Sequence, residues 1–206
     1  MGARLISLLG DNTALDDHAG QLIAVASEQG FPFYRALGTI YRGWSKVLGG
    51  EVGKGLSLLR SGLSAHSATG TELQKCFYLA LLAEACEIAG QVEEALSLAD
   101  DALRIADRIG ERWFTAELYR HKGQLLLRQG HTEGAEAIYR KALASASEQD
   151  AKLWVLRAAL ALAQLRRDQG HALEARSLLA PVYGWFTEGF ETVDLKNARA
   201  LLDELA

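Results

Sequence analysis

Glycine returns along this chain at a fixed interval, and this interval constrains the fold more than any other feature. One series has a 40-residue spacing, and a second series falls midway between its members, with Asp150 in the next slot. The glycines are Gly10, Gly50, Gly90, Gly130 and Gly170, and then Gly30, Gly70 and Gly110. Glycine suits the left-handed residue that ends a helix because it lacks a Cβ atom. The interval therefore predicts a series of helices that each end at a glycine, and a repeat of this length is typical of stacked helical hairpins.

Small residues recur with the same period where the two helices of a hairpin would cross. First helices carry Gly43, Ala83, Gly123 and Ala163, and second helices carry Gly55, Ala95, Ala135 and Ala175. A larger side chain at a close crossing would push the two backbones apart. The order of small residue, glycine turn, alanine, large residue and alanine resembles the tetratricopeptide (TPR) repeat, and it is most complete in Tyr119, Gly123, Gly130, Ala135, Tyr139 and Ala142.

We therefore expect an all-α protein, a right-handed α-solenoid of TPR-like helical hairpins with a 40-residue period and a C-terminal capping helix. A single array would span residues 1–206, with a partial hairpin 1–30, hairpins 31–70, 71–110, 111–150 and 151–190, and a capping helix 191–206. The expected helices are 2–9, 14–29, 33–48, 52–68, 72–89, 92–109, 112–129, 132–149, 152–169, 172–187 and 192–205. The short first helix suggests a fragment, or a start inside a longer array.

The C-terminal stretch 181–206 departs from the repeat. Pro181 should kink or end the helix that contains it. Four aromatic residues follow, and we interpret them as a plug over the last hairpin, with an exposed docking patch as the alternative; they are Tyr183, Trp185, Phe186 and Phe190. The final helix has an apolar face that favours a cap, formed by Leu195, Ala198, Leu201, Leu202 and Leu205.

Charge and hydropathy exclude several classes of protein. The chain has 22 basic and 26 acidic residues, and its net charge of −4 argues against broad binding to nucleic acid or to an anionic membrane. No apolar run is long enough to span a bilayer, and the N-terminus lacks a signal-peptide core. Cys76 and Cys86 lie about 15 Å apart along one expected helix, too far for a disulfide. A reducing, cytoplasmic location is expected.

The search for catalytic or metal-binding residues returns none. The run 49–55 (GGEVGKG) is glycine-rich, but it lacks the spacing and the hydroxyl residue of a phosphate-binding loop. The five histidines show no metal-ligand spacing to one another or to a cysteine. Carboxylate pairs such as Glu93 and Glu94 are better explained by a solvated helix face. We therefore expect no enzyme activity, cofactor or metal.

A binding surface is expected along the first helix of each hairpin, which lines the concave groove of TPR arrays. The 40-residue register selects the candidate groove residues Trp44, Phe77, Glu84, Glu117, Arg120, Gln124, Arg157 and Gln164. The alternative is that the charged members only pair with one another, Arg120 with Glu117 or Glu84 and Arg157 with Glu117.

Three stretches carry a more specific resemblance. They are 30–33 (GFPF) with Gly43 and Trp44, 110–113 (GERW) with 116–120 (AELYR), and 179–190 (LAPVYGWFTEGF). These stretches resemble the C-terminal TPR regions of bacterial multidomain signalling proteins, namely class III adenylate cyclase homologues and regulators with an AAA/STAND ATPase module. The resemblance implies a helper segment whose catalytic parts lie upstream, and it supplies no catalytic residue.

Together these observations predict a non-catalytic interaction or scaffold module of a larger signalling protein. Its partner would be a protein, a peptide or another domain of the parent chain, and neither nucleic acid nor a membrane. The alternative is a small-molecule (inducer) sensing domain of an ATP-dependent regulator, with the ligand in the groove. A third hypothesis is self-association through the N-terminal end.

Overall fold

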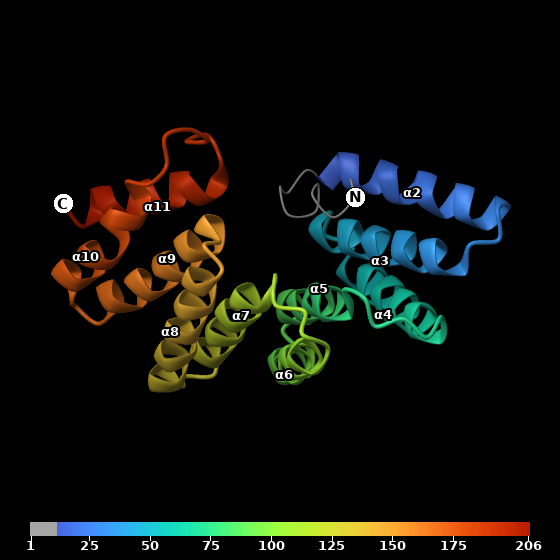
Figure 1. Cartoon of the computed structure of the whole chain (residues 1–206), viewed down its shortest axis with the longest axis horizontal. Helices are drawn as coiled ribbons and strands as arrows, with labels where there is room; N and C mark the ends of the chain where they lie inside the picture. Colours follow the sequence, from blue (N-terminus) through green and yellow to red (C-terminus); the bar gives the residue numbers. More distant parts are fainter. Residues whose placement is uncertain (1–11) are drawn as a thin grey trace. The chain divides into compact units, whose positions relative to one another are not determined.

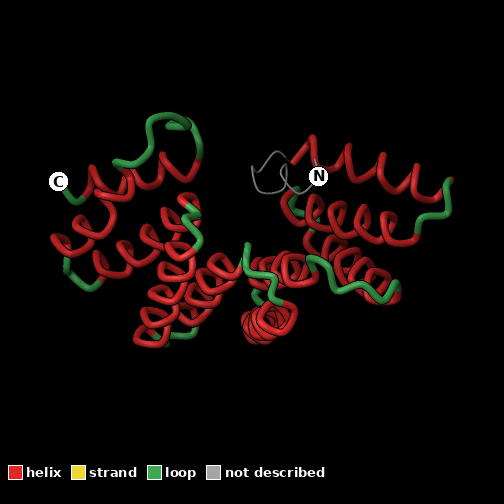
Figure 2. The backbone as a smooth tube through the Cα atoms, in the orientation of Figure 1, coloured by secondary structure: helices red, strands yellow, loops and turns green. Residues whose placement is uncertain are grey.

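The computed structural model describes residues 12–206, which contain helices and turns but no strand (Figure 1). The helices are α2 (Asn12–Glu28), α3 (Pro32–Leu48), α4 (Val52–Ala68), α5 (Lys75–Ile88), α6 (Val92–Ile109), α7 (Thr115–Arg128), α8 (Thr132–Glu148), α9 (Lys152–Asp168), α10 (Ala172–Tyr183) and α11 (Val193–Glu204). Short loops join them (Figure 2). The predicted helix 2–9 lies outside the described residues.

The described residues fall into two compact units that divide after Ile105, inside α6. In the first unit α3 packs on α2 and on α4, and it also contacts α5. In the second unit α7 packs on α8, α8 on α9, and α9 on α10, while α11 contacts both α9 and α10. Consecutive helices within each unit thus pack on one another, as α3 does on α4 and α7 on α8. The grouping of all hairpins into one array remains a prediction.

The helix ends follow the glycine series. The predicted glycines within the described range have φ between 68° and 86°, and Asp150 has φ 48° in the slot that lacks a glycine. After most of these residues the next N–H donates to the carbonyl five residues before it; for example, the Glu51 N–H donates to the Lys46 carbonyl at 2.8 Å. The prediction that these residues end helices is confirmed for all of them except Gly10, which lies outside the described residues.

The small residues lie at close helix crossings, as predicted. A Cβ atom added at Gly43 would stand 2.8 Å from the Leu59 nitrogen and 2.9 Å from the Gly55 carbonyl oxygen. At Gly123 an added Cβ would stand 2.5 Å from the Tyr139 ring. The alanines of the second helices are fully buried; they are Ala95, Ala135 and Ala175.

Three helix bounds differ from the prediction by three residues or more. Helices α5 and α7 each begin three residues late, because residues before them form a turn, in which Gln74 has a left-handed φ of 60°. Helix α10 ends at Tyr183 rather than at residue 187. Pro181 lies in its last turn and the helix ends two residues later, in agreement with the prediction that this proline kinks or ends the helix.

The C-terminal segment is a cap in one part only. Helix α11 buries its predicted apolar face, with Leu195, Ala198 and Leu201 in the core. Trp185 and Phe190, however, are 49% and 42% exposed, while Tyr183 and Phe186 are half-buried, so these four rings do not form a fully buried plug. They lie in the loop that leaves the core once α10 has ended, where Phe190 contacts only the half-buried Tyr183 among the described rings.

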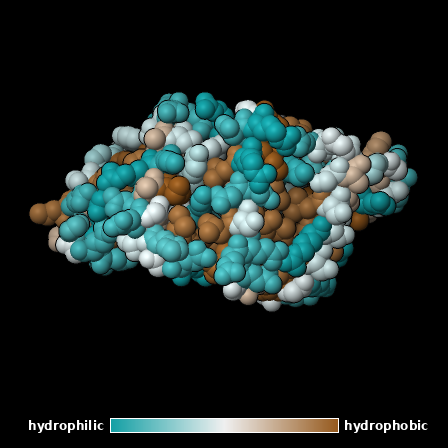
Figure 3. Space-filling model, turned by 90° about the horizontal axis from the view of Figure 1, so that it is seen from below, coloured by the Kyte–Doolittle hydropathy of each residue, from teal (hydrophilic) through white to brown (hydrophobic). Residues whose placement is uncertain are grey.

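Both cysteines are buried and reduced, in agreement with their interpretation as core residues. Among residues 12–206 no helix is long and apolar enough to cross a membrane. The surface shown in Figure 3 carries hydrophobic areas interrupted by hydrophilic side chains.

A candidate binding pocket on helices α7, α9 and α11

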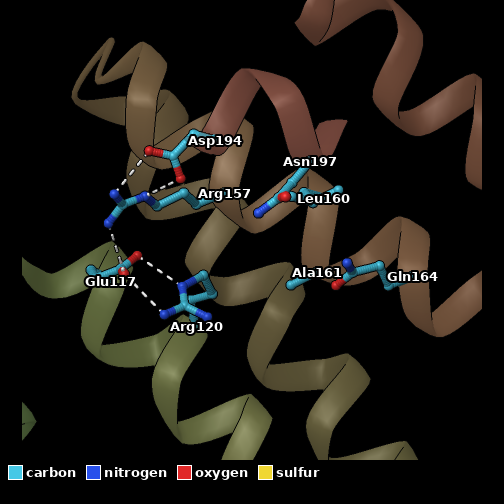
Figure 4. A pocket seen from close by; sticks show the side chains of 8 residues that line it. All are labelled: Glu117, Arg120, Arg157, Leu160, Ala161, Gln164, Asp194 and Asn197. Carbon is cyan, nitrogen blue, oxygen red and sulfur yellow. Dashed lines mark hydrogen bonds and ion pairs between the residues drawn. The ribbon is translucent and has the colours of Figure 1, made fainter. Parts of the chain in front are cut away.

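A pocket of about 260 Å³ lies on one face of the second unit (Figure 4). Three helices supply its lining: Glu117 and Arg120 from α7, Arg157, Leu160, Ala161 and Gln164 from α9, and Asp194 and Asn197 from α11. Helices α7 and α9 are the first helices of their hairpins. The pocket therefore lies on the face that the sequence register assigned to the groove.

The 40-residue register explains why these side chains meet. Glu117, Arg157 and Asn197 follow one another by one repeat length and occupy the same register position on three alternate helices. Arg120 and Leu160 form a second row with the same spacing. Because each repeat places equivalent residues side by side, residues spaced by one repeat length lie in a line across the pocket.

Arg120 is held by its own helix. Its Nε donates to Glu117 Oε2 at 2.9 Å and its Nη2 donates to Oε1 at 2.9 Å. Its Nη1 also donates to Gln124 Oε1 at 3.1 Å. The paired bonds have the fork geometry in which a guanidinium binds a carboxylate most strongly.

Arg157 links all three helices. Its Nε and Nη2 donate to the two carboxylate oxygens of Asp194, at 2.7 and 2.9 Å. Its Nη1 donates to Glu117 Oε1 at 3.3 Å. The guanidinium carbon lies 5.2 Å from the ring centroid of Trp154, within the range of a cation–π contact. Trp154 is fixed in turn, since its Nε1 donates to the Trp113 carbonyl at 3.1 Å.

Burial and ion pairing act in opposite directions on these charges. Burial of the Glu117 carboxyl group opposes its ionisation, but Arg120 and Arg157 outweigh this effect and leave its pKa below the ordinary value. Burial likewise disfavours the charged form of Arg157, but its hydrogen bonds to Asp194 and its attraction to Glu117 raise its pKa. The pocket wall thus carries two guanidinium groups and two carboxylates whose charges cancel.

Two amide side chains complete the pocket without a partner of their own. Gln164 and Asn197 are exposed, and neither makes a side-chain hydrogen bond within the described part of the chain. Each amide offers both a donor and an acceptor. They can therefore pair with a main-chain amide of a bound segment.

Only some of the predicted groove residues line the pocket. Glu117, Arg120, Arg157 and Gln164 line the pocket, and Gln124 supports Arg120. Phe77 and Trp44 are buried, 0% and 6% exposed, and do not line this pocket, so their assignment to a groove stays a prediction. The other helices of the first unit cover α3 and α5, and large apolar rings on these covered faces become core. Glu84 is half-buried on α5.

Sequence reasoning missed the contribution of α11. The apolar face of this helix was assigned from the sequence, but the pairing of Asp194 with Arg157 and the place of Asn197 in the pocket were not. The signal was present, because Asn197 follows Arg157 by one repeat length. The register match was not used because the last helix was interpreted as a cap outside the repeat.

The pocket offers binding groups rather than reactive ones. No serine, cysteine or threonine lines it beside a base. No group of three or more His, Cys, Asp and Glu side chains among residues 12–206 is arranged to hold a metal ion.

Comparison with known proteins supports an array of TPR-like hairpins. Residues 76–148 match the tetratricopeptide repeat family. No curated protein matches the chain. Several solved structures share its fold at low sequence identity, which makes the α-solenoid of TPR-like hairpins the fold of this chain.

BtubC (BKLC) from P. vanneervenii aligns over 94% of this chain and 89% of its own, with a TM-score of 0.72 and 16% identity. A putative kinesin light chain with TPR-like repeats from Podosopora anserina aligns over 88% and 90%, with a TM-score of 0.65 and 18% identity. A Rap protein complexed with competence and sporulation factor aligns over 98% of this chain but 61% of its own, with a TM-score of 0.71 and 13% identity.

Proposed function

We propose that this chain is a non-catalytic interaction module that binds a protein or peptide segment on the face formed by α7, α9 and α11. The observation that carries the proposal is the pocket itself. It combines two fixed guanidinium groups with two amide side chains that have no partner in the described residues. These groups recognise the polar atoms of a polypeptide, both carboxylates and main-chain amides.

The size and rigidity of the pocket favour a peptide segment over an enclosed metabolite. Its volume of about 260 Å³ lies below the range of roughly 300–1,000 Å³ that is usual for small-molecule sites. The ion pairs among Glu117, Arg120 and Arg157 hold the polar groups in place before any ligand arrives, which reduces the entropy lost on binding. The structural similarity to a Rap protein that was solved with competence and sporulation factor supports the same conclusion.

We propose further that the chain belongs to a larger signalling protein and binds either a separate partner or another domain of that protein. The support is the resemblance of residues 179–190 and the two shorter stretches to bacterial cyclase-like and ATPase regulators.

The test is a selection of peptides from a random display library on the purified chain. The best peptide is then titrated by calorimetry against the wild type, Gln164→Ala and Asn197→Ala. Gln129→Ala is the matched control, because Gln129 is an exposed amide at the end of α7 outside the pocket. Loss of one neutral hydrogen bond costs about 1 kcal/mol, so each pocket variant should bind roughly fivefold more weakly.

Two results would refute the proposal. The first is that the library yields no peptide that binds the folded chain. The second is that the selected peptides bind the pocket variants as tightly as they bind the wild type. A metabolite that raises the melting temperature of the wild type, and not that of the pocket variants, would support the sensor alternative instead.

A further inference from the structure

Asp194 accepts hydrogen bonds from the two Arg157 donors, Nε and Nη2, that a bound carboxylate would otherwise use. It lies in the first turn of α11, and both of its oxygens accept hydrogen bonds from Arg157, at 2.7 and 2.9 Å. Figure 4 shows this pair on the wall of the pocket. The strongest anion-binding edge of the pocket is therefore filled by a carboxylate of the same chain.

The orientation of Arg157 does not depend on Asp194 alone. Glu117 accepts a bond from Nη1 at 3.3 Å, and the Trp154 ring lies beneath the guanidinium at 5.2 Å. Both contacts come from α7 and α9. If Asp194 leaves, the Nε and Nη2 donors remain fixed toward the pocket.

Helix α11 is held to the unit by a limited set of contacts. It has 12 residues and buries Leu195, Ala198 and Leu201. Besides the Asp194–Arg157 pair, two polar contacts hold it, an ion pair between Arg167 and Glu204 at 2.9 Å and a bond from Arg176 to the Leu202 carbonyl at 3.1 Å. Because the ion pair is partly exposed, it contributes little.

The charges identify the chemistry of the ligand. With Asp194 in place, the four ionised groups of the pocket sum to zero. Without it, Arg120, Arg157 and Glu117 leave one net positive charge. Displacement of Asp194 therefore creates a site for an anion. A cationic segment that displaced Asp194 would supply no carboxylate to pair with Arg157.

Resting on the proposed function, we propose that Asp194 is an internal competitor for an acidic partner segment. A carboxylate of the partner, from an Asp or Glu side chain or a chain terminus, replaces Asp194 on Arg157. Gln164 and Asn197 then bind the adjoining main-chain amides. The apparent affinity for the partner is reduced by the fraction of molecules in which Asp194 holds Arg157.

The test compares two variants that make the same charge change on the same helix. Asp194→Asn removes the competitor. Asp203→Asn is the control, because Asp203 is exposed and lies 3.8 Å from Arg199, outside the pocket. The probes are capped tetraglutamate, tetraglutamine and tetralysine peptides at low ionic strength. Binding is followed by NMR, through the Nε–H signal of Arg157.

We expect tetraglutamate to bind Asp194→Asn at least roughly fivefold more tightly than the wild type, since a forked ion pair no longer competes. The control should bind like the wild type. In Asp194→Asn the Arg157 signal should move toward its wild-type position as tetraglutamate is added. Arg157→Lys, which keeps the charge and loses the fork, should abolish the preference for tetraglutamate.

Asp194→Ala is measured in parallel, with circular dichroism to confirm that α11 remains helical in each variant. Equal tetraglutamate affinity in the wild type, Asp194→Asn and Asp194→Ala would overturn the inference, as would a preference for tetraglutamine or tetralysine. If those peptides bind at the pocket independently of Asp194, the proposed function stands, and the role of Asp194 as an internal competitor is refuted. If no peptide shifts any pocket signal in any variant, both are refuted.

Discussion

Two glycines of helix α4 should respond in opposite ways to the same substitution. Gly55 faces α3, and a Cβ atom added there would contact Val47 Cγ2 and stand 2.7 Å from the Gly43 carbonyl oxygen and 2.9 Å from the Val47 nitrogen. Two of these atoms belong to the main chain and cannot rotate away. Gly53, two residues earlier on the same helix, has no neighbour within 4 Å of an added Cβ.

The expected free energies follow from these contacts. Overpacking costs roughly 1–3 kcal/mol, and the better helix propensity of alanine returns up to about 1 kcal/mol. Gly55→Ala should therefore lower the free energy of unfolding by about 1–2 kcal/mol. Gly53→Ala has only the favourable effect and should raise it by roughly 0.4–1 kcal/mol.

Differential scanning calorimetry would measure both variants. In a unit of about 100 residues, each kcal/mol shifts the melting temperature by roughly 4–8 °C. Gly55→Ala should melt clearly below the wild type and Gly53→Ala slightly above it. If both variants shift in the same direction, or Gly55→Ala is neutral, the helices do not cross at this position and the register is wrong.

Three further predictions concern packing, backbone conformation and pH. Ala135→Leu should destabilise the second unit by roughly 1–3 kcal/mol in urea unfolding, because Ala135 lies in a core with Tyr139 and Leu162, while the exposed Ala137→Leu should have little effect. Asp150→Gly should leave the melting temperature unchanged or raise it, since glycine adopts the observed φ of 48° without strain; a clear loss would contradict this. Burial lowers the pKa of His66 below 6.5, and Lys75 lowers it further, so its neutral form is favoured in the folded state. The wild type should therefore lose stability as the pH falls below about 6.5. The urea midpoints of the wild type and of His66→Phe, measured over this pH range, test the prediction. The same pH dependence in both proteins would count against it.

The repeat was readable from the sequence because it depends on local conformation and size. Gly90 and Gly130 must adopt positive φ, and Ala95 and Ala175 must be small, so both requirements appear directly as residue types. Accessibility was harder to predict. Phe77 and Glu117 occupy the same register position, but a ring there joins the core and a carboxylate there binds two guanidinium groups. The difference depends on which neighbouring helices cover each repeat, and the register alone does not contain that information.

The last helix shows how one element both closes a repeat and completes a site. Lys196, Arg199 and Asp203 of α11 follow Leu156, Ala159 and Ala163 of α9 by one repeat length. The three residues of α9 are buried, whereas the three charged residues of α11 are exposed. Because charged side chains are costly to bury, the outer face of α11 suits water rather than another helix. Its groove face keeps the register, which places Asn197 in line with Glu117 and Arg157 and brings Asp194 onto Arg157. A helix that is apolar on one face, charged on the outer face and in register on the groove face can thus pack on the last hairpin and also carry the proposed competitor, Asp194.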